Sequence, residues 1–144
     1  MSRMPRISPI ALRILRDSLP GVTVTTWGAD IDYRTFPLIN IRRVGGKRHE
    51  SKPNLLAFQV IEMTCYTNVG LPETEQLYED ALEALFEAQR LQTLYPEGYL
   101  HSIKETMGAT QFSSLFMDSW RVQGLIQLGH RPLQNQENIH VTKR

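Results

Sequence analysis

The chain has 144 residues, of which 41% are hydrophobic and 22% charged, and its formal net charge is +1. This length fits one domain with a core of its own, and the near-neutral charge excludes a general attraction to nucleic acid or anionic lipid. Cys65 is the only cysteine, which excludes an internal disulfide and a multi-cysteine metal site. No apolar run has the length of a membrane span, and no apolar stretch follows the N-terminal arginines as in a secretory signal. We therefore expect a protein that stays in the cytosol where it is made and has no membrane partner.

The first predicted element is a short helix that begins near Ser8. A serine can cap a helix, and Pro9 suits its first position. Apolar residues between 10 and 15 recur at helical spacing, and Pro20 begins the turn that ends the helix.

Three strands are predicted next. The run 22–27 is β-branched and alternating, and the run 36–44 follows after a loop. Pro37 places the second run at a strand start or at an edge, because proline cannot donate to a ladder. The polar loop 45–54 joins this run to 55–66 in a long hairpin. Since the third run is apolar on both faces over most of its length, we expect a central strand covered by helices on one face and by further protein on the other.

The clearest predicted element is a helix over residues 72–92. Alanine and leucine side chains recur at helical spacing, and six acidic side chains occupy much of the remaining surface. Two more strands follow, 99–107 and 120–128, and the alternation in the last one predicts a strand with one buried side. The connection 108–119 is apolar for a loop.

The element order is helix, strand, hairpin, helix, hairpin. This order predicts one α+β domain over residues 1–133, with two helices packed on one face of a largely antiparallel or mixed sheet of four to five strands. Residues 134–144 are polar and lack a core pattern, so we expect a flexible C-terminal tail until a partner binds it.

The sequence carries no motif for catalysis, for a cofactor or for a metal. Gly45-Gly46 lies between two strands, which is the wrong context for a phosphate loop, and no nucleophile elbow is present. The four histidines lack ligand spacing, and His49 and His130 lie beside basic or turn residues, which predicts that both are exposed. Cys65 lies in an apolar run and is expected in the core. We therefore expect no enzyme, no cofactor and no metal.

Charge is segregated into two patches. The basic one surrounds the expected Gly45-Gly46 turn and consists of Arg42, Arg43, Lys47, Arg48 and Lys52. It is either a solvated hairpin tip, a contact for phosphate, or a contact for an acidic surface of another subunit. The acidic patch lies on the helix 72–92, and its candidate interface residues are Glu75, Glu79 and Glu83, with a solvated helix face as the alternative. Opposed patches on different elements suit head-to-tail contacts in a closed ring.

The layout from Ile7 to Leu133 resembles that of siphophage tail terminator proteins, of the kind found in phages of actinobacteria. The pieces that carry the resemblance are the short first helix, the strand that leads to Asp30, the Phe-Pro-Leu-Ile to Arg-Arg-Val-Gly-Gly stretch of residues 36–46, the long apolar strand, the helix around Ala81-Leu82, and the late Trp120-Arg121-Val122 strand.

The resemblance implies a structural virion protein that forms a hexameric ring at the head-proximal end of the tail. Such a ring stops polymerisation of the tail tube and joins the tail to the head-completion complex. The implied partners are further copies of the chain, the tail tube protein, a head-completion or neck protein, and genomic DNA that passes through the ring. The implied location is the neck region of the virion, after assembly in the host cytoplasm. Two other functions stay open, a nucleic-acid-binding module that uses the basic hairpin and a related head–tail connector. The near-neutral charge and the lack of aromatic residues in the basic loop argue against a nucleic-acid-binding module.

Overall fold

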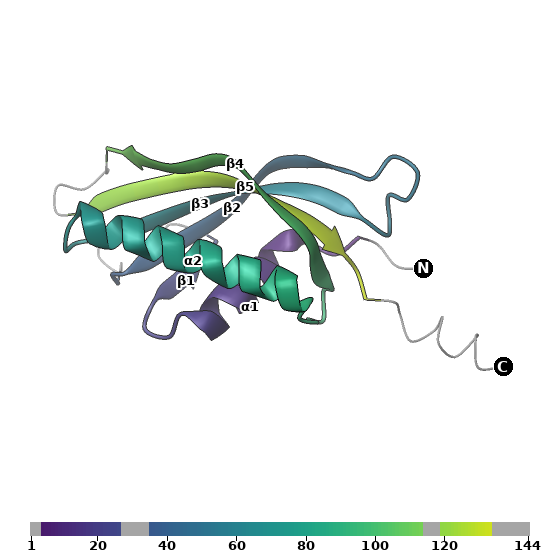
Figure 1. Ribbon diagram of the computed structural model, residues 1–144, viewed down its shortest axis with the longest axis horizontal. Helices are drawn as coiled ribbons and strands as arrows, with labels where there is room; N and C mark the ends of the chain where they lie inside the picture. Colours follow the sequence, from purple (N-terminus) through teal and green to yellow (C-terminus); the bar gives the residue numbers. More distant parts are fainter. Residues whose placement is uncertain (1–3, 27–34, 114–118, 134–144) are drawn as a thin grey trace.

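Five strands form one mixed sheet in the order β1-β2-β3-β5-β4 (Figure 1). The computed structural model describes residues 4–26, 35–113 and 119–133. The strands are β1 Thr23–Thr25, β2 Leu38–Arg48, β3 Ala57–Thr67, β4 Tyr99–Phe112 and β5 Trp120–Arg131. β1 is parallel to β2, and the other neighbouring pairs are antiparallel. The expected α+β class is confirmed, and β3 lies at the centre of the sheet as predicted.

Two helices, α1 Ile7–Ser18 and α2 Leu71–Leu91, lie on one side of the sheet (Figure 1). The buried side chains of α2 recur at spacings of three and four residues, so they form one stripe that faces the strands. This stripe joins the buried side chains of α1 and of the inner strands in one apolar cluster. The helix 72–92 is therefore confirmed, although Leu91 at its end is exposed. Neither helix in the described part of the chain has the length and hydropathy to cross a membrane.

The start of α1 differs from the expectation. The helix begins at Ile7, Arg6 occupies the cap position, and no side chain caps it. Ser8 is buried within the first turn, so the prediction that it caps the helix was wrong. Pro9 still falls in the first turn, where a missing N–H is tolerated because that group has no partner within the helix.

β2 continues past the glycines at which a turn was predicted. A β-bulge lies between Arg43 and Gly45, after which the ladder resumes with Gly46 opposite Gln59 of β3. Gly46 has a φ of +101°, and a Cβ there would overlap the β3 backbone, so only glycine allows the two strands to pair this closely. The chain turns at residues 49–56 instead. Pro37 immediately precedes β2, which confirms the strand-start alternative.

β4 is also longer than predicted and runs to Phe112 through three register irregularities, so the predicted loop 108–119 begins later. Bulges of this kind let an edge strand bend without ending its pairing. The expectations for Trp27, for the apolar residues 115–117 and for the tail 134–144 lie outside the described residues.

One histidine lies in the core. β5 runs to Arg131, beyond the predicted end at Leu128, so the alternation of its buried face continues to His130. His130 is fully buried, and its Nε2 lies 2.7 Å from the carbonyl oxygen of Glu97. The prediction that His130 is exposed was therefore wrong. Cys65 is buried as predicted, and this burial raises the pKa of its thiol.

Candidate interaction surfaces

The residue types that ligate metals do not come together at one site in the described part of the chain. Within residues 4–26, 35–113 and 119–133, no group of three or more His, Cys, Asp or Glu is placed to hold a metal ion. His49 is half-buried, in contrast to the expected exposure, and its Nδ1 accepts the backbone N–H groups of Ser51 and Lys52. His49 therefore shapes the turn that it occupies.

The β2–β3 hairpin forms a basic arm, defined here as residues 42–56. β1 pairs only with Leu38–Asn40, so β2 beyond this point is an edge, and every residue from Arg42 to Arg48 is exposed. The structure places all five predicted basic residues on this arm, and all are exposed. The arm carries five basic side chains and one acidic one, which is a net charge of +4.

The arm is internally held by polar contacts. Arg42 forms an ion pair with Glu62 of β3 at 3.1 Å, and Arg48 donates to the side-chain oxygen of Asn54 at 3.2 Å. Within the described residues, Lys47 and Lys52 have no ion-pair partner. These two side chains are therefore the cations that the arm most readily offers to another surface.

Two further arginines enlarge the basic surface. Arg6 lines a hollow together with Arg42 and Arg43, and Arg131 lines another with His49 and Lys52. Sequence reasoning missed both because they lie far from the arm along the chain, and no local pattern connects them to it.

α2 presents its acidic side chains on two flanks. The predicted residues Glu75, Glu79 and Glu83 are exposed, and their spacing of four places them in one row. Glu73 and Asp80 are also exposed, and their spacing of seven places them in a second row. With six acidic side chains and one arginine, the helix has a net charge of −5.

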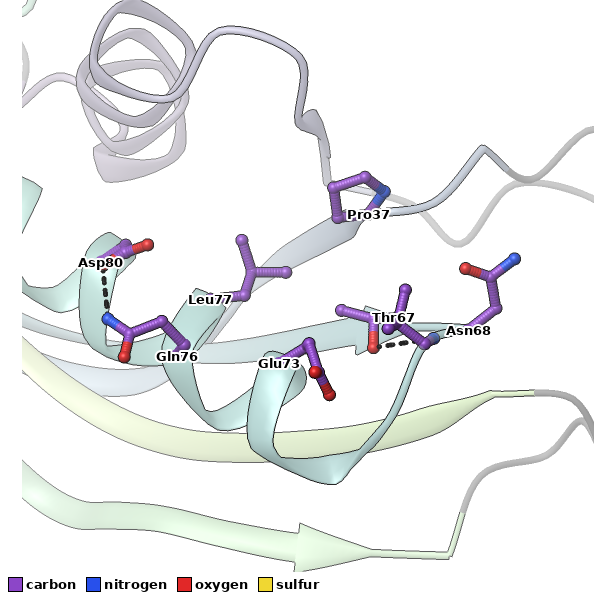
Figure 2. A pocket seen from close by; sticks show the side chains of 8 residues that line it. Pro37, Thr67, Asn68, Glu73, Gln76, Leu77 and Asp80 are labelled. Carbon is purple, nitrogen blue, oxygen red and sulfur yellow. Dashed lines mark hydrogen bonds between the residues drawn. The ribbon is translucent and has the colours of Figure 1, made fainter.

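A groove of about 300 Å³ adjoins the second row of acids (Figure 2). Leu77 of α2 and Pro37 just before β2 line the groove, and Val69 completes a mostly apolar lining. Glu73 and Asp80 lie at its rim, where the amide of Gln76 donates to Asp80 at 2.8 Å. Sequence reasoning missed this groove, since its walls come from three segments that only the fold brings together.

The turn between β3 and α2 gives the groove a fixed wall. The hydroxyl of Thr74 donates to the carbonyl of Gly70 at 2.7 Å, and the hydroxyls of Thr67 and Thr74 lie 2.7 Å apart. The N–H of Val69 donates to the Thr67 hydroxyl at 3.4 Å. These bonds hold Val69 in place although 68% of its surface is exposed.

The groove and the basic arm lie at opposite ends of the molecule (Figure 1). β2 begins beside the groove and ends in the arm, so its length separates the two surfaces by roughly 35 Å. A single copy therefore cannot bring its own arm to its own groove.

A small α+β domain with two oppositely charged, widely separated surfaces is typical of a protein that assembles with others through unlike patches. The chain matches the family model described as phage tail termination protein over residues 3–137, and it belongs to that family. The sequence resemblance to tail terminators is thereby confirmed, and the protein is a structural component of a phage tail.

Two phage proteins are similar to the chain in sequence, and one solved structure is similar to it in fold. The chain is 59% identical to the Gene 22 protein of Mycobacterium phage L5 and 56% identical to that of Mycobacterium phage D29. Each match spans 133 residues and covers 91% of this chain and 96% of the relative. A chain in the solved virion of a native gene transfer agent (GTA) particle is similar in fold, with a TM-score of 0.53 and 12% identity over 85% of this chain and 90% of that one.

Proposed function

We propose that the protein forms a closed hexameric ring at the head-proximal end of the tail tube, where it stops tube polymerisation and joins the tail to the head-completion complex. Membership of the phage tail termination family over nearly the whole chain carries this proposal. A ring of identical subunits needs two unlike contact surfaces on each copy, and the arm and α2 meet this need.

The partners in this proposal are further copies of the chain, the tail tube protein and a head-completion or neck protein, and genomic DNA passes through the ring. The protein acts as a structural part in the neck region of the virion, after assembly in the host cytoplasm, and it needs neither catalysis nor a cofactor.

The proposed subunit contact joins the basic arm of one copy to α2 of the next. The candidate residues that the sequence offers for this contact are Arg42, Arg43, Lys47, Arg48 and Lys52 on the arm, and Glu75, Glu79 and Glu83 on the helix. Exposed ion pairs contribute only about 0–1 kcal/mol each, so these charges steer and align the subunits. Apolar contacts have to supply most of the affinity.

Electron microscopy of particles made without this protein tests the function. A terminator predicts tails of uncontrolled length that carry no heads, and normal tails when the protein is supplied from a plasmid. A head–tail connector would instead give unattached tails of normal length. Attached tails of normal length in the absence of the protein would overturn the proposal.

A second candidate function is nucleic-acid binding by the arm, which the gathering of seven basic residues on and beside it favours. Binding of duplex DNA by the monomer, with an affinity that falls steeply as salt rises and on reversal of Arg43 and Arg48 to glutamate, would support it. A protein that assembles and does not bind DNA would exclude it.

A further inference from the structure

We propose that the groove between α2 and the start of β2 receives the tip of the basic arm from a second copy of this chain. Leu55 of the arm occupies the apolar floor, and the arm's lysines lie against Glu73 and Asp80. This inference rests on the proposed ring. It moves the contact on α2 from the row of Glu75, Glu79 and Glu83 to the flank that carries Glu73 and Asp80.

The groove offers an apolar site of suitable size. Val69 is 68% exposed, and it lies beside Leu77 and Pro37 in a hollow of about 300 Å³. A cavity of about 150 Å³ already accommodates a benzene-sized group. A leucine side chain therefore fits the groove, and its entry removes the exposed surface of Val69 from water.

The arm tip offers a matching apolar group on a held turn. Leu55 is 43% exposed, and its N–H donates to the carbonyl of Lys52 at 3.1 Å. The N–H of His49 donates to the carbonyl of Leu56 at 2.9 Å, which closes the turn. Since the tip is already shaped by these bonds, little further ordering is needed when it binds.

Charge favours this flank of α2 for the same contact. The arm has a net charge of +4 and the helix −5, so the two elements attract each other. Only the row of Glu73 and Asp80 adjoins the apolar groove, whereas the row of Glu75, Glu79 and Glu83 is not part of its lining. Because exposed charges alone bind weakly, the flank that combines charge with an apolar hollow is the favoured one.

The placement of the two surfaces suits a ring. Each copy presents its arm at one end of the sheet and its groove at the other (Figure 1). When the arm of each copy enters the groove of the next, an open row of copies has a free groove at one end and a free arm at the other. Closure of the row into a ring fills both.

Cysteine cross-linking tests the contact directly. The variant Leu55→Cys, Val69→Cys is oxidised under conditions in which the wild type assembles, either alone or with its tail tube protein. The expected result is a ladder of disulfide-linked oligomers on a non-reducing gel. Cys65 is fully buried and does not compete. Equal mixing of the two single variants should give linked dimers only, because each copy then has one thiol at this contact.

Phe86 supplies the matched control, since it is an apolar residue of α2 that is 37% exposed and lies outside the groove. A variant with Leu55→Cys and Phe86→Cys should give no ladder. The assignment of the arm to the groove would be overturned if this control gave a ladder and the Leu55→Cys, Val69→Cys variant gave none. Linked dimers from the Leu55→Cys single variant alone would overturn it as well.

A charge exchange provides the second measurement. Reversal of Lys47 and Lys52 to glutamate should raise the concentration for half-assembly by on the order of 10-fold at low salt. Reversal of Glu73 and Asp80 to lysine in the same chain should restore most of the loss. Restoration by Glu79→Lys and Glu83→Lys instead would show that the arm meets the other flank.

The two proposals fail differently. The groove assignment is overturned, and the ring is left intact, if the wild type assembles, the cysteine variants do not cross-link, and the charge variants assemble as the wild type does. A wild type that forms no ring with or without the tube protein overturns the proposed function and this contact with it.

Discussion

The contact between α2 and β5 depends on one glycine. Gly124 lies on the buried face of β5, and the fully buried Tyr78 of α2 packs directly over it. A Cβ at Gly124 would overlap the Tyr78 hydroxyl, and it would lie 2.7 Å from the Cζ of Tyr78 and 2.9 Å from the carbonyl oxygen of Met107. We therefore predict that Gly124→Ala destabilises the fold.

The expected cost follows from overpacking. An extra carbon in a packed core costs about 1–3 kcal/mol, because backbone or side chains have to shift. The Tyr78 hydroxyl donates to Glu105 at 3.1 Å, so Tyr78→Phe alone should cost about 1 kcal/mol. In the double variant the overlapping hydroxyl is absent. Its loss of stability should therefore be smaller than the sum of the two single losses by at least about 1 kcal/mol.

Urea denaturation at equilibrium measures all four members of this cycle. Gly108→Ala is the matched control, since a Cβ there meets only the Glu105 Oε2 at 3.5 Å. This substitution should cause no loss of stability, because alanine restricts the unfolded chain without a clash in the folded one. Equal effects of the two glycine substitutions, or additive energies in the cycle, would refute the reasoning from Tyr78.

Three further predictions concern the core. Leu85→Ala should lower the free energy of unfolding by about 2–5 kcal/mol because Leu85 is fully buried. Glu83→Ala on the exposed face of α2 should change it by no more than about 0.5 kcal/mol. Equal effects of the two substitutions in urea denaturation would contradict the assignment of Leu85 to the buried face of α2 and Glu83 to the exposed one. Burial lowers the pKa of His130 below its ordinary 6.5, so the unfolded chain takes up a proton before the folded protein does, and stability should fall as the pH drops below about 6.5. His130→Gln should flatten this dependence, and an unchanged slope between pH 7.5 and 5.5 would contradict the assignment. The thiol of Cys65 should react with a thiol reagent only on unfolding, since it is buried and its pKa is raised, and rapid labelling of the native protein would argue against this.

The element order could be predicted from local pattern alone. α2 was located to within one residue because its apolar spacing and its acidic surface are properties of neighbouring residues on one helix. The central position of β3 followed from an apolar run with few polar interruptions. The charged surfaces were also visible in the sequence, since the predicted residues of each lie within one continuous stretch of the chain.

Tertiary structure decided the features that depend on contacts between distant segments. β2 runs past Gly45 and Gly46 because β3 supplies a ladder there, although two adjacent glycines by themselves favour a turn. His130 is buried because pairing with β3 and β4 extends β5 beyond its apolar run. The groove arises where the starts of α2 and β2 meet the end of β3. No periodic pattern within one segment predicts contacts between distant segments, because burial depends on which surfaces the completed sheet and helices bring together.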